Sequence, residues 1–335
     1  MKNVIIQLIK EGVMRIKPEN ELLTFSESLK ALLDRLPPNH PRRQFLNAEL
    51  YREEAGKRGE KRIKRKFMEF YSAEEAEIIW DVRLQINDWK VQIDGLLLTG
   101  KGAVIIESKN ISGKIHFDQE TEEFYRIDEE GVKTIMENPL FQLEKHKRFM
   151  QEWFRLQKIA LPVEGLVVFT SKKCEFISKV PGVYICKTYQ MNKYLYDVLL
   201  KFPQNKASVS PAQIKQLIVA SKTPFKRIPL CAYYHIKREE LETGVYCQNC
   251  GLRTMRRIKK SWNCSSCKHR NKDAHIQTIR EYFSLISANL DSRQFRAFCH
   301  IESPFVASRM LASVDLLRSG PPKKRVYTMK MEERK

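Results

Sequence analysis

Three residues with side chains suited to metal-assisted chemistry lie within two neighbouring apolar segments. Asp94 is in the segment Val91–Thr99, and Glu107 and Lys109 lie at the end of the segment Ala103–Lys109. Carboxylate oxygens are the ligands that hard divalent cations such as Mg²⁺ prefer, and a lysine can orient an attacking water or neutralise phosphate charge. These residue types therefore indicate metal-assisted chemistry on a phosphate ester, provided that the fold brings them together.

The two segments are expected to form a β-hairpin with its turn at Gly100-Lys101. Paired positions would then sum to 201, which places Asp94 opposite Glu107 and Gln92 opposite Lys109. Because side chains alternate along a strand, all four would share one face. Two carboxylates that face each other repel and are costly to desolvate, so a cation between them is favoured. The alternative is a structural cluster of ion pairs.

The elements around this hairpin are predicted in the order helix, three strands, helix, strand. A helical pattern over 45–71 precedes strands over 76–84, 89–99 and 103–110, with a further strand at 114–118. Asn138-Pro139 are expected to be the N-cap and first residue of a helix that runs to Phe154, and a β-branched run over 163–170 indicates a strand buried on both faces.

Two glycines, Gly56 and Gly59, fall inside the first of these helices. Each costs about 1 kcal/mol relative to alanine. The pair is best explained if one face of the helix is pressed closely against another element.

These segments resemble the nuclease-related domain (NERD) of the PD-(D/E)xK nuclease superfamily over about residues 45–170. The matching pieces are Gly56-Lys57-Arg58-Gly59-Glu60, Gln92-Ile93-Asp94, Ile106-Glu107-Ser108-Lys109-Asn110 with Gly113, and Asn138-Pro139-Leu140-Phe141-Gln142 with His146. The resemblance implies an α/β fold with a mixed sheet flanked by helices.

The same resemblance implies the roles of the site residues. Asp94, Glu107 and the Ser108 carbonyl would bind Mg²⁺ or Mn²⁺, and Lys109 would be the catalytic lysine. Glu60 would be an accessory acid and Gln142 a helper near the phosphate. Ser108 departs from the aliphatic residue that is usual at its position in the family.

One helix face carries both Gln142 and His146, four residues apart. The alternative for Gln142 is ordinary hydrogen bonding at a surface. For His146, filling a gap in an apolar stripe with Leu143, Met150 and Trp153 is preferred over catalysis.

Four of the 8 cysteines form two Cys-x-x-Cys pairs, Cys247 with Cys250 and Cys264 with Cys267. Each pair can direct two thiolates at one ion, and the loop between the pairs is long enough for a short hairpin. This spacing predicts a zinc ribbon with a tetrahedral Zn²⁺ site, which is structural because four thiolates leave no position for substrate. Two disulfides are the alternative, disfavoured in a reducing cytoplasm.

Basic residues gather between the cysteine pairs and near the C-terminus. Cations combined with an aromatic ring can track a phosphate backbone and stack on a base. A solvated charged hairpin is the alternative. The candidate nucleic-acid-binding residues are Arg253, Arg256, Arg257, Lys259, Lys260, Trp262, Lys323, Lys324 and Arg325.

The C-terminal residues are expected to form three short helices, over 275–286, 292–299 and 304–317, followed by a basic strand over 323–328. Asp291 is expected to cap the second helix. The order resembles a winged helix-turn-helix, in which the third helix enters the DNA major groove. A pure packing role is the alternative.

The length of 335 residues predicts several domains. We expect an N-terminal extension (1–43), a NERD-like domain (44–200), a linker (201–240), a zinc ribbon (241–272) and a helical, winged-helix-like tail (273–335). The net charge of +20 favours a polyanionic partner, with salt-sensitive binding. Charged residues interrupt the N-terminal 30 residues before any apolar run reaches signal-peptide or membrane length, which predicts a cytoplasmic protein without a membrane partner.

The sequence therefore predicts a metal-dependent, DNA endonuclease-like protein whose ribbon and tail bind DNA. The rival prediction is a catalytically inactive DNA-binding or regulatory protein with a nuclease fold. Charge does not distinguish DNA from RNA, and the sequence does not predict the oligomeric state.

Overall fold

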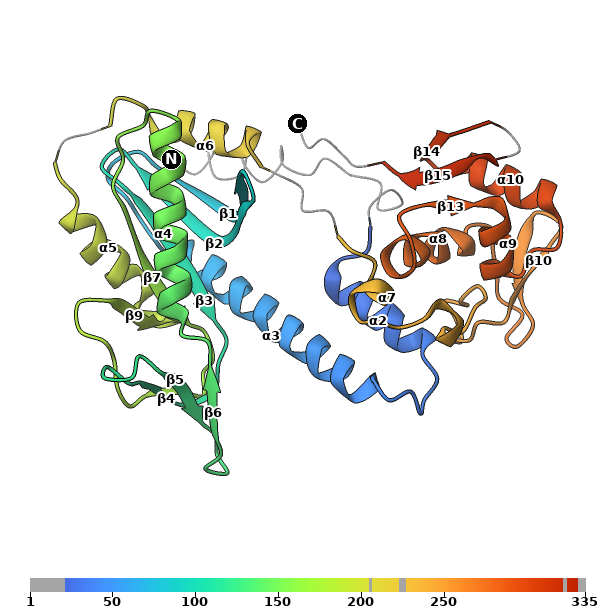
Figure 1. Cartoon of the computed structure of the whole chain (residues 1–335), viewed down its shortest axis with the longest axis horizontal. Coiled ribbons are helices and arrows are strands. Elements are labelled where there is room, and N and C mark those ends of the chain that lie inside the picture. Colours follow the sequence, from blue (N-terminus) through green and yellow to red (C-terminus); the bar gives the residue numbers. More distant parts are fainter. Residues whose placement is uncertain (1–21, 205–206, 223–226, 322–323, 331–335) are drawn as a thin grey trace. The chain divides into compact units, whose positions relative to one another are not determined.

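The structure of the chain is a computed structural model that describes residues 22–204, 207–222, 227–321 and 324–330 (Figure 1). The chain divides into two compact units. Residues 51–226 form one, called here the sheet unit, and residues 1–50 with 227–335 form the other, called here the ribbon unit.

A five-stranded mixed sheet is the centre of the sheet unit, as predicted. Its order is β1 (Ala76–Ile86), β2 (Trp89–Thr99), β3 (Ala103–Lys109), β7 (Val163–Phe169) and β9 (Tyr184–Lys187). The first three strands are antiparallel, whereas β3, β7 and β9 are parallel. In the β2–β3 hairpin, Gly95 pairs with Ile106 and Leu98 with Ala103, so the expected register, in which positions sum to 201, is confirmed.

Helices cover both faces of this sheet (Figure 1). On one face, α4 (Pro139–Leu156) packs on the odd-numbered residues of β3 and β7, and α6 (Pro211–Ala220) packs on β1 and β2. On the other face, α3 (Arg43–Phe67) and α5 (Met191–Lys201) pack on the even-numbered residues of these strands. The short helix η2 (Thr188–Gln190) precedes α5. The two cores are called here the α4 core and the α5 core.

The start of α4 is confirmed in detail. The side chain of Asn138 accepts a hydrogen bond from the backbone N–H of Leu140, and Pro139 occupies the first turn, where its missing N–H has no cost. The helix crosses β7 at Gly165, where a Cβ atom would lie 2.6 Å from Leu143 Cδ1. The absence of a side chain at Gly165 therefore lets α4 lie directly on the sheet.

A second, four-stranded sheet follows β3. Its order is β6 (Lys133–Met136), β5 (Phe124–Ile127), β4 (Gly113–Phe117) and β8 (Cys174–Phe176). Phe117 and Phe124 from this sheet belong to the α4 core, so the two sheets share apolar packing. Sequence patterns predicted only β4 among its strands.

In the ribbon unit, the N-terminal helix α2 (Phe25–Arg35) packs with α7 (Leu230–Tyr233) and α8 (Ala274–Leu285) around a common apolar core. Thr24 and Glu27 form a capping box at the start of α2. Arg35 is fully buried, and its guanidinium lies 2.6 Å from the carboxylate of Glu281. The short helix η3 (Arg238–Glu240) follows α7.

The remaining elements of the ribbon unit are a small sheet and a helical region. The sheet contains β10 (Met255–Ile258), β11 (Ser261–Cys264) and β12 (Arg270–Asn271). After α8 come β13 (Leu290–Asp291), α9 (Ser292–Cys299), α10 (Pro304–Ser313), β14 (Leu316–Ser319) and β15 (Val326–Met329). This order of helix, strand, two helices and hairpin is similar to that of a winged helix.

Asp291 caps α9, as predicted, through a capping box with Gln294. The expectation that the third helix reaches Leu317 is wrong. The helix ends at Ser313 because Val314 is extended, and Leu316–Ser319 pairs with β15. Among the helices that the structure describes, none has the length and apolar character to cross a membrane.

Candidate functional site

The strands β2 and β3 separate at the predicted site. Their pairing ends at Gly95 and Ile106. Beyond this point the backbone N–H of Ser108 donates to Asp94 Oδ2 at 2.8 Å, and the Ser108 hydroxyl donates to the same oxygen at 2.7 Å. The carboxylate of Asp94 therefore takes the place of a backbone acceptor between the separating strands.

This separation corrects one expectation. Gln92 is not paired with Lys109, and it donates instead from Nε2 to Asp81 Oδ1 at 2.9 Å. Asp81 has a positive φ of 53° and lies between the paired residues of β1 on either side of it. Around this point the side chains that face the α4 core change from odd-numbered to even-numbered positions along β2, so that Ile93, rather than Gln92, packs with Leu96. Simple alternation from Gln92 to Leu96 therefore does not hold.

Glu107 is buried, with 2% of its surface exposed. Its Oε1 lies 3.4 Å from Lys109 Nζ. Its Oε2 lies 3.2 Å from Nδ1 of His146, but this contact lacks hydrogen-bond geometry, and neither atom has a hydrogen-bond partner in the described part of the chain. A buried acceptor without a partner is costly, so Glu107 Oε2 is an available ligand atom.

Lys109 is positioned by α4. Its Nζ donates to Gln142 Oε1 at 2.5 Å as well as to Glu107. The helix therefore supplies both Gln142 and His146 to the cluster. Sequence reasoning assigned His146 to packing and missed its contact with Glu107, although its spacing of four residues from Gln142 was the signal that pointed to this face.

The charge of Asp94 is disfavoured by its surroundings. Burial raises the pKa of Asp94 to about 6, the charges of Glu107 and Glu60 add to the increase, and the hydrogen bonds from Ser108 oppose it. Glu60, on α3, also has a raised pKa, chiefly through burial. The predicted residues Glu60, Asp94, Glu107, Lys109 and Gln142 are thus brought together.

A hard divalent cation fits this donor set. In a strand, the N–H and C=O of one residue point to the same edge. Since the Ser108 N–H points at Asp94, the Ser108 carbonyl faces the same side, whereas the Lys109 carbonyl accepts from Thr170 on the opposite side. Two carboxylates and one carbonyl are oxygen ligands of the type that Mg²⁺ binds, with water completing its coordination.

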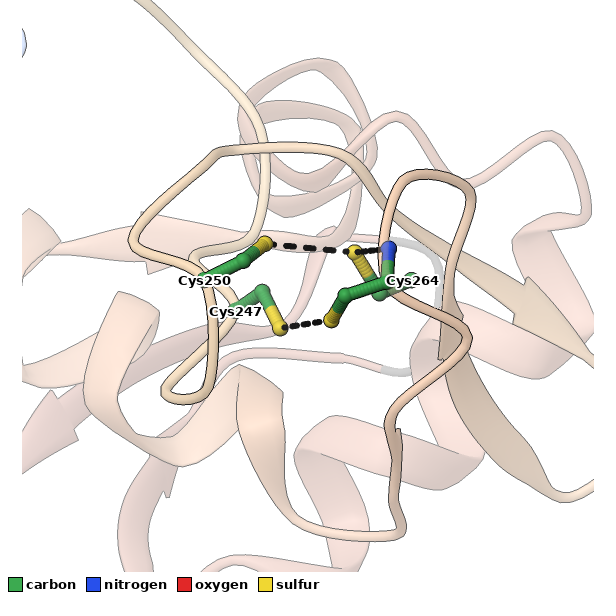
Figure 2. A group of neighbouring side chains, drawn as sticks. Cys247, Cys250 and Cys264 are labelled. Carbon is green, nitrogen blue, oxygen red and sulfur yellow. Dashed lines mark hydrogen bonds between the residues drawn. The ribbon is translucent and has the colours of Figure 1, made fainter.

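The four paired cysteines converge at one point in the ribbon unit (Figure 2). Their sulfur atoms all lie within 4.8 Å of one another, with Cys247 and Cys267 at 3.6 Å and Cys250 and Cys264 also at 3.6 Å. Within the described residues this is the only group of three or more such ligands close enough to hold a metal ion. The cluster could bind structural Zn²⁺ and leaves no open position.

The two cysteine pairs have the same local geometry. The N–H of Gly251 donates to the Cys247 carbonyl, and the N–H of Lys268 donates to the Cys264 carbonyl. Both residues have a positive φ, of 75° and 63°. The pKa of Cys264 is lowered to about 6, first by its hydrogen bond with Thr254 and then by backbone N–H groups, which favours its thiolate. Although a hydrogen bond from the backbone N–H of Leu252 opposes the increase, the pKa of Cys250 is raised to about 12 by burial and by its hydrogen bonds with the other three thiols.

The predicted nucleic-acid-binding residues do not all lie on the surface. Trp262 is fully buried, and its Nε1 donates to Nδ1 of His275 at 3.3 Å, so the expectation that its ring stacks on a base is wrong. Burial lowers the pKa of His275 to about 4, which keeps this acceptor neutral. The sequence around Trp262 does not indicate whether its ring faces the core or the solvent, so its burial could not be predicted.

The basic candidates also differ in exposure. Arg253 is mostly buried beside Glu242, and Arg257 lies over the Trp262 ring. Arg325 is partly buried. The exposed candidates are Arg256, Lys259, Lys260 and Lys324, whereas Lys323 lies outside the described residues.

Residues 55–170 match the family described as NERD, nuclease-related domain. Searches of the curated proteins and of the solved structures gave no match. The matched range contains the whole carboxylate and lysine cluster and most of the five-stranded sheet. The chain therefore contains a nuclease-related domain, which suggests a nuclease-related function with nucleic acid as its substrate or partner.

Proposed function

We propose that this protein is a Mg²⁺- or Mn²⁺-dependent nuclease that hydrolyses phosphodiester bonds in DNA. The observation that carries the proposal is the buried Glu107 Oε2, which has no hydrogen-bond partner in the described residues and is close enough to Asp94 to raise its pKa. A divalent cation between these carboxylates would give Glu107 Oε2 a partner and would stabilise the charged form of Asp94.

The roles of the residues follow from their positions. Asp94, Glu107 and the Ser108 carbonyl would hold the metal, which supplies Lewis acidity and lowers the pKa of a bound water. Lys109, held by Gln142, would place a positive charge beside the scissile phosphate. Glu60 would adjust the protonation of Asp94 from α3.

The ribbon unit would hold the nucleic acid. We infer that Cys247, Cys250, Cys264 and Cys267 bind structural Zn²⁺, and that the exposed Arg256, Lys259, Lys260 and Lys324 contact phosphates together with Lys323. The net charge of +20 would support this binding at low salt. A thiolate-bound zinc site is suited to a reducing cytoplasm.

The proposal is tested by incubating the purified chain with plasmid DNA, linear DNA and RNA in Mg²⁺, in Mn²⁺ and in EDTA. We expect cleavage of DNA that requires the metal and is lost in Asp94→Asn and Lys109→Ala. The matched controls are Asp88→Asn and Lys173→Ala, which change exposed residues of the same unit and should cleave normally. Cleavage that persists in both site variants would contradict the proposal.

A second candidate is a DNA-binding or regulatory protein whose nuclease fold lacks turnover. It is favoured by the Ser108 hydroxyl, which adds to the backbone N–H a second hydrogen bond to Asp94 Oδ2 that an aliphatic residue could not make. Binding of DNA without cleavage in any metal would support this candidate.

A further inference from the structure

A pocket of about 370 Å³ lies beside the carboxylate cluster in the sheet unit. Its walls come from the C-terminal part of α3 with Glu69 beyond it, and from the last residues of β7 and β9 with the segments that follow them. Lys109 pairs with Phe169, and Phe169 with Lys187, so the ends of β3, β7 and β9 form one row. Two strand spacings, about 10 Å, therefore separate the catalytic lysine from the Lys187 backbone. Ligands commonly bind at the carboxyl ends of parallel strands.

The charge of this pocket selects an anion. Five cationic side chains line it, and the single carboxylate, Glu69, accepts a hydrogen bond from one of them, Lys66. The other cations are Arg62, Arg65, Lys172 and Lys187. So many cations around one cavity repel one another unless an anion lies between them.

The pocket also contains polar groups suited to phosphate oxygens. Thr188 lines it, and the buried hydroxyl of this residue has no hydrogen-bond partner among the described residues. Arg62 is fixed, because its Nη1 donates to Asn110 Oδ1 at 3.2 Å and to the Thr170 carbonyl at 2.8 Å. A buried donor without a partner and a positioned guanidinium indicate a site already arranged for its ligand.

An exposed aromatic ring at the pocket favours the phosphate of a nucleotide over a free anion, because the ring can stack on the attached base. Tyr189 lines the same pocket and is 70% exposed. Aromatic rings beside a cationic groove are the platforms on which bases of single-stranded nucleic acid stack.

We propose that this pocket binds a second phosphate of the nucleic-acid strand, with the attached base stacked on Tyr189. The inference rests on the proposed nuclease function, whose scissile phosphate lies at Lys109. The bound group is either an internal phosphodiester or a terminal phosphomonoester, which present the same anionic oxygens.

Fluorescence anisotropy with oligothymidines tests the proposal. The full-length Asp94→Asn protein, which prevents hydrolysis, is titrated with oligonucleotides that carry a 5′-phosphate, a 3′-phosphate or no terminal phosphate. The pocket variants are Lys172→Gln, Lys187→Gln and Tyr189→Ala. Lys173→Gln is the matched control, since Lys173 neighbours Lys172, is exposed and pairs with Glu129 outside the pocket.

We expect each lysine variant to reduce the slope of log Kd against log salt by about 0.7, the value for one lost phosphate contact to a single strand. Tyr189→Ala should bind about tenfold more weakly, and Tyr189→Phe should bind normally. An effect on all three oligonucleotides identifies an internal phosphodiester. An effect confined to a phosphorylated one identifies a terminal phosphate.

Binding by the pocket variants that equals binding by Lys173→Gln would overturn the inference. If the wild-type protein still cleaves DNA in that case, only the pocket inference fails. If instead Lys172 and Lys187 are needed for binding but the wild-type protein cleaves nothing, the pocket stands and the proposed nuclease function fails.

Discussion

Asp94 lies in surroundings that oppose its own charge. Burial and the nearby carboxylates of Glu107 and Glu60 raise its pKa to about 6, and only the two hydrogen bonds from Ser108 favour ionisation. In a purely structural ion-pair cluster, a cationic side chain would instead be expected to lower the pKa of each carboxylate. Binding of a cation by this cluster would therefore stabilise the charged form of Asp94.

This property makes a prediction about stability. Between about pH 4 and 6 the folded protein holds a proton on Asp94 that the unfolded chain has released, so the free energy of unfolding falls as the pH rises through this range. Asp94→Asn removes this penalty and keeps an oxygen for the Ser108 bonds. We expect the variant to match the wild type at pH 4 and to exceed it by about 1 to 3 kcal/mol at pH 7 without added metal.

Urea denaturation at a series of pH values measures this difference. Effects of pH on groups distant from Asp94, including the cysteine cluster, cancel when the two proteins are compared at each pH. A difference that stays constant from pH 4 to pH 7 would show that Asp94 ionises normally.

At the residue scale, the sequence predicts which side chains can do chemistry better than it predicts which neighbours a side chain contacts. The hairpin register, which depends on local turn geometry, places Asp94 and Glu107 next to the last paired residues, Gly95 and Ile106, although the strands separate there. The contact of His146 with Glu107 and the burial of Trp262 depend on how α4 and α8 pack, and no local pattern records this.

At the scale of elements, α3 approaches the site through Gly59. A Cβ atom at Gly59 would lie 2.5 Å from Thr170 Oγ1 and 3.2 Å from Asn110 Cβ, whereas nothing lies within 4 Å of a Cβ at Gly56. The predicted close approach is thus confirmed for Gly59 and wrong for Gly56. The side chain of Asn110 donates to the Ala55 carbonyl of the helix and fixes the same approach.

These two glycines provide a matched pair of variants. Gly56→Ala should stabilise the protein by about 1 kcal/mol, the difference in helix propensity. Gly59→Ala gains the same propensity but forces Thr170 or the helix to move, so we expect a net loss of about 1 to 2 kcal/mol. Urea denaturation followed by tryptophan fluorescence compares them, and equal stabilisation by both variants would refute the close contact.

The elements that sequence patterns predict are the long ones. β2 and α4 have the periodicity and the caps that define their type and their bounds to within two residues. The strands β5, β6, β8 and β9 contain three or four residues each, too few to show a period. They form strands because neighbouring strands supply the hydrogen bonds.

At the scale of the whole molecule, each unit has its own core. Residues 22–36, expected as part of an N-terminal extension, contribute Leu29, Leu32 and Leu36 to the core of the ribbon unit. The buried pair of Arg35 and Glu281 spans 246 residues of sequence. Sequence patterns could not predict this packing, because they carry no information on contacts so far apart in the chain.

Separate cores lead to a prediction about zinc. The wild-type protein should contain about one equivalent of Zn²⁺, and Cys264→Ser should lose it and lower the thermal midpoint of the ribbon unit only. The control, Cys174→Ala, changes a buried cysteine of the sheet unit and should retain the metal. Elemental analysis and calorimetry measure both, and less than about half an equivalent in the wild type would contradict the site.

The most direct test of the nuclease-like centre is calorimetric titration of the full-length, zinc-loaded protein with Mn²⁺. We predict one class of site in the sheet unit that Glu107→Gln and Asp94→Asn each weaken by at least about tenfold, because each removes a charged ligand. Glu152→Gln, a change on α4 at a residue that pairs with Arg155 outside the cluster, should leave the affinity unaltered. Equal Mn²⁺ affinity in the wild type and both ligand variants would contradict a cation between Asp94 and Glu107.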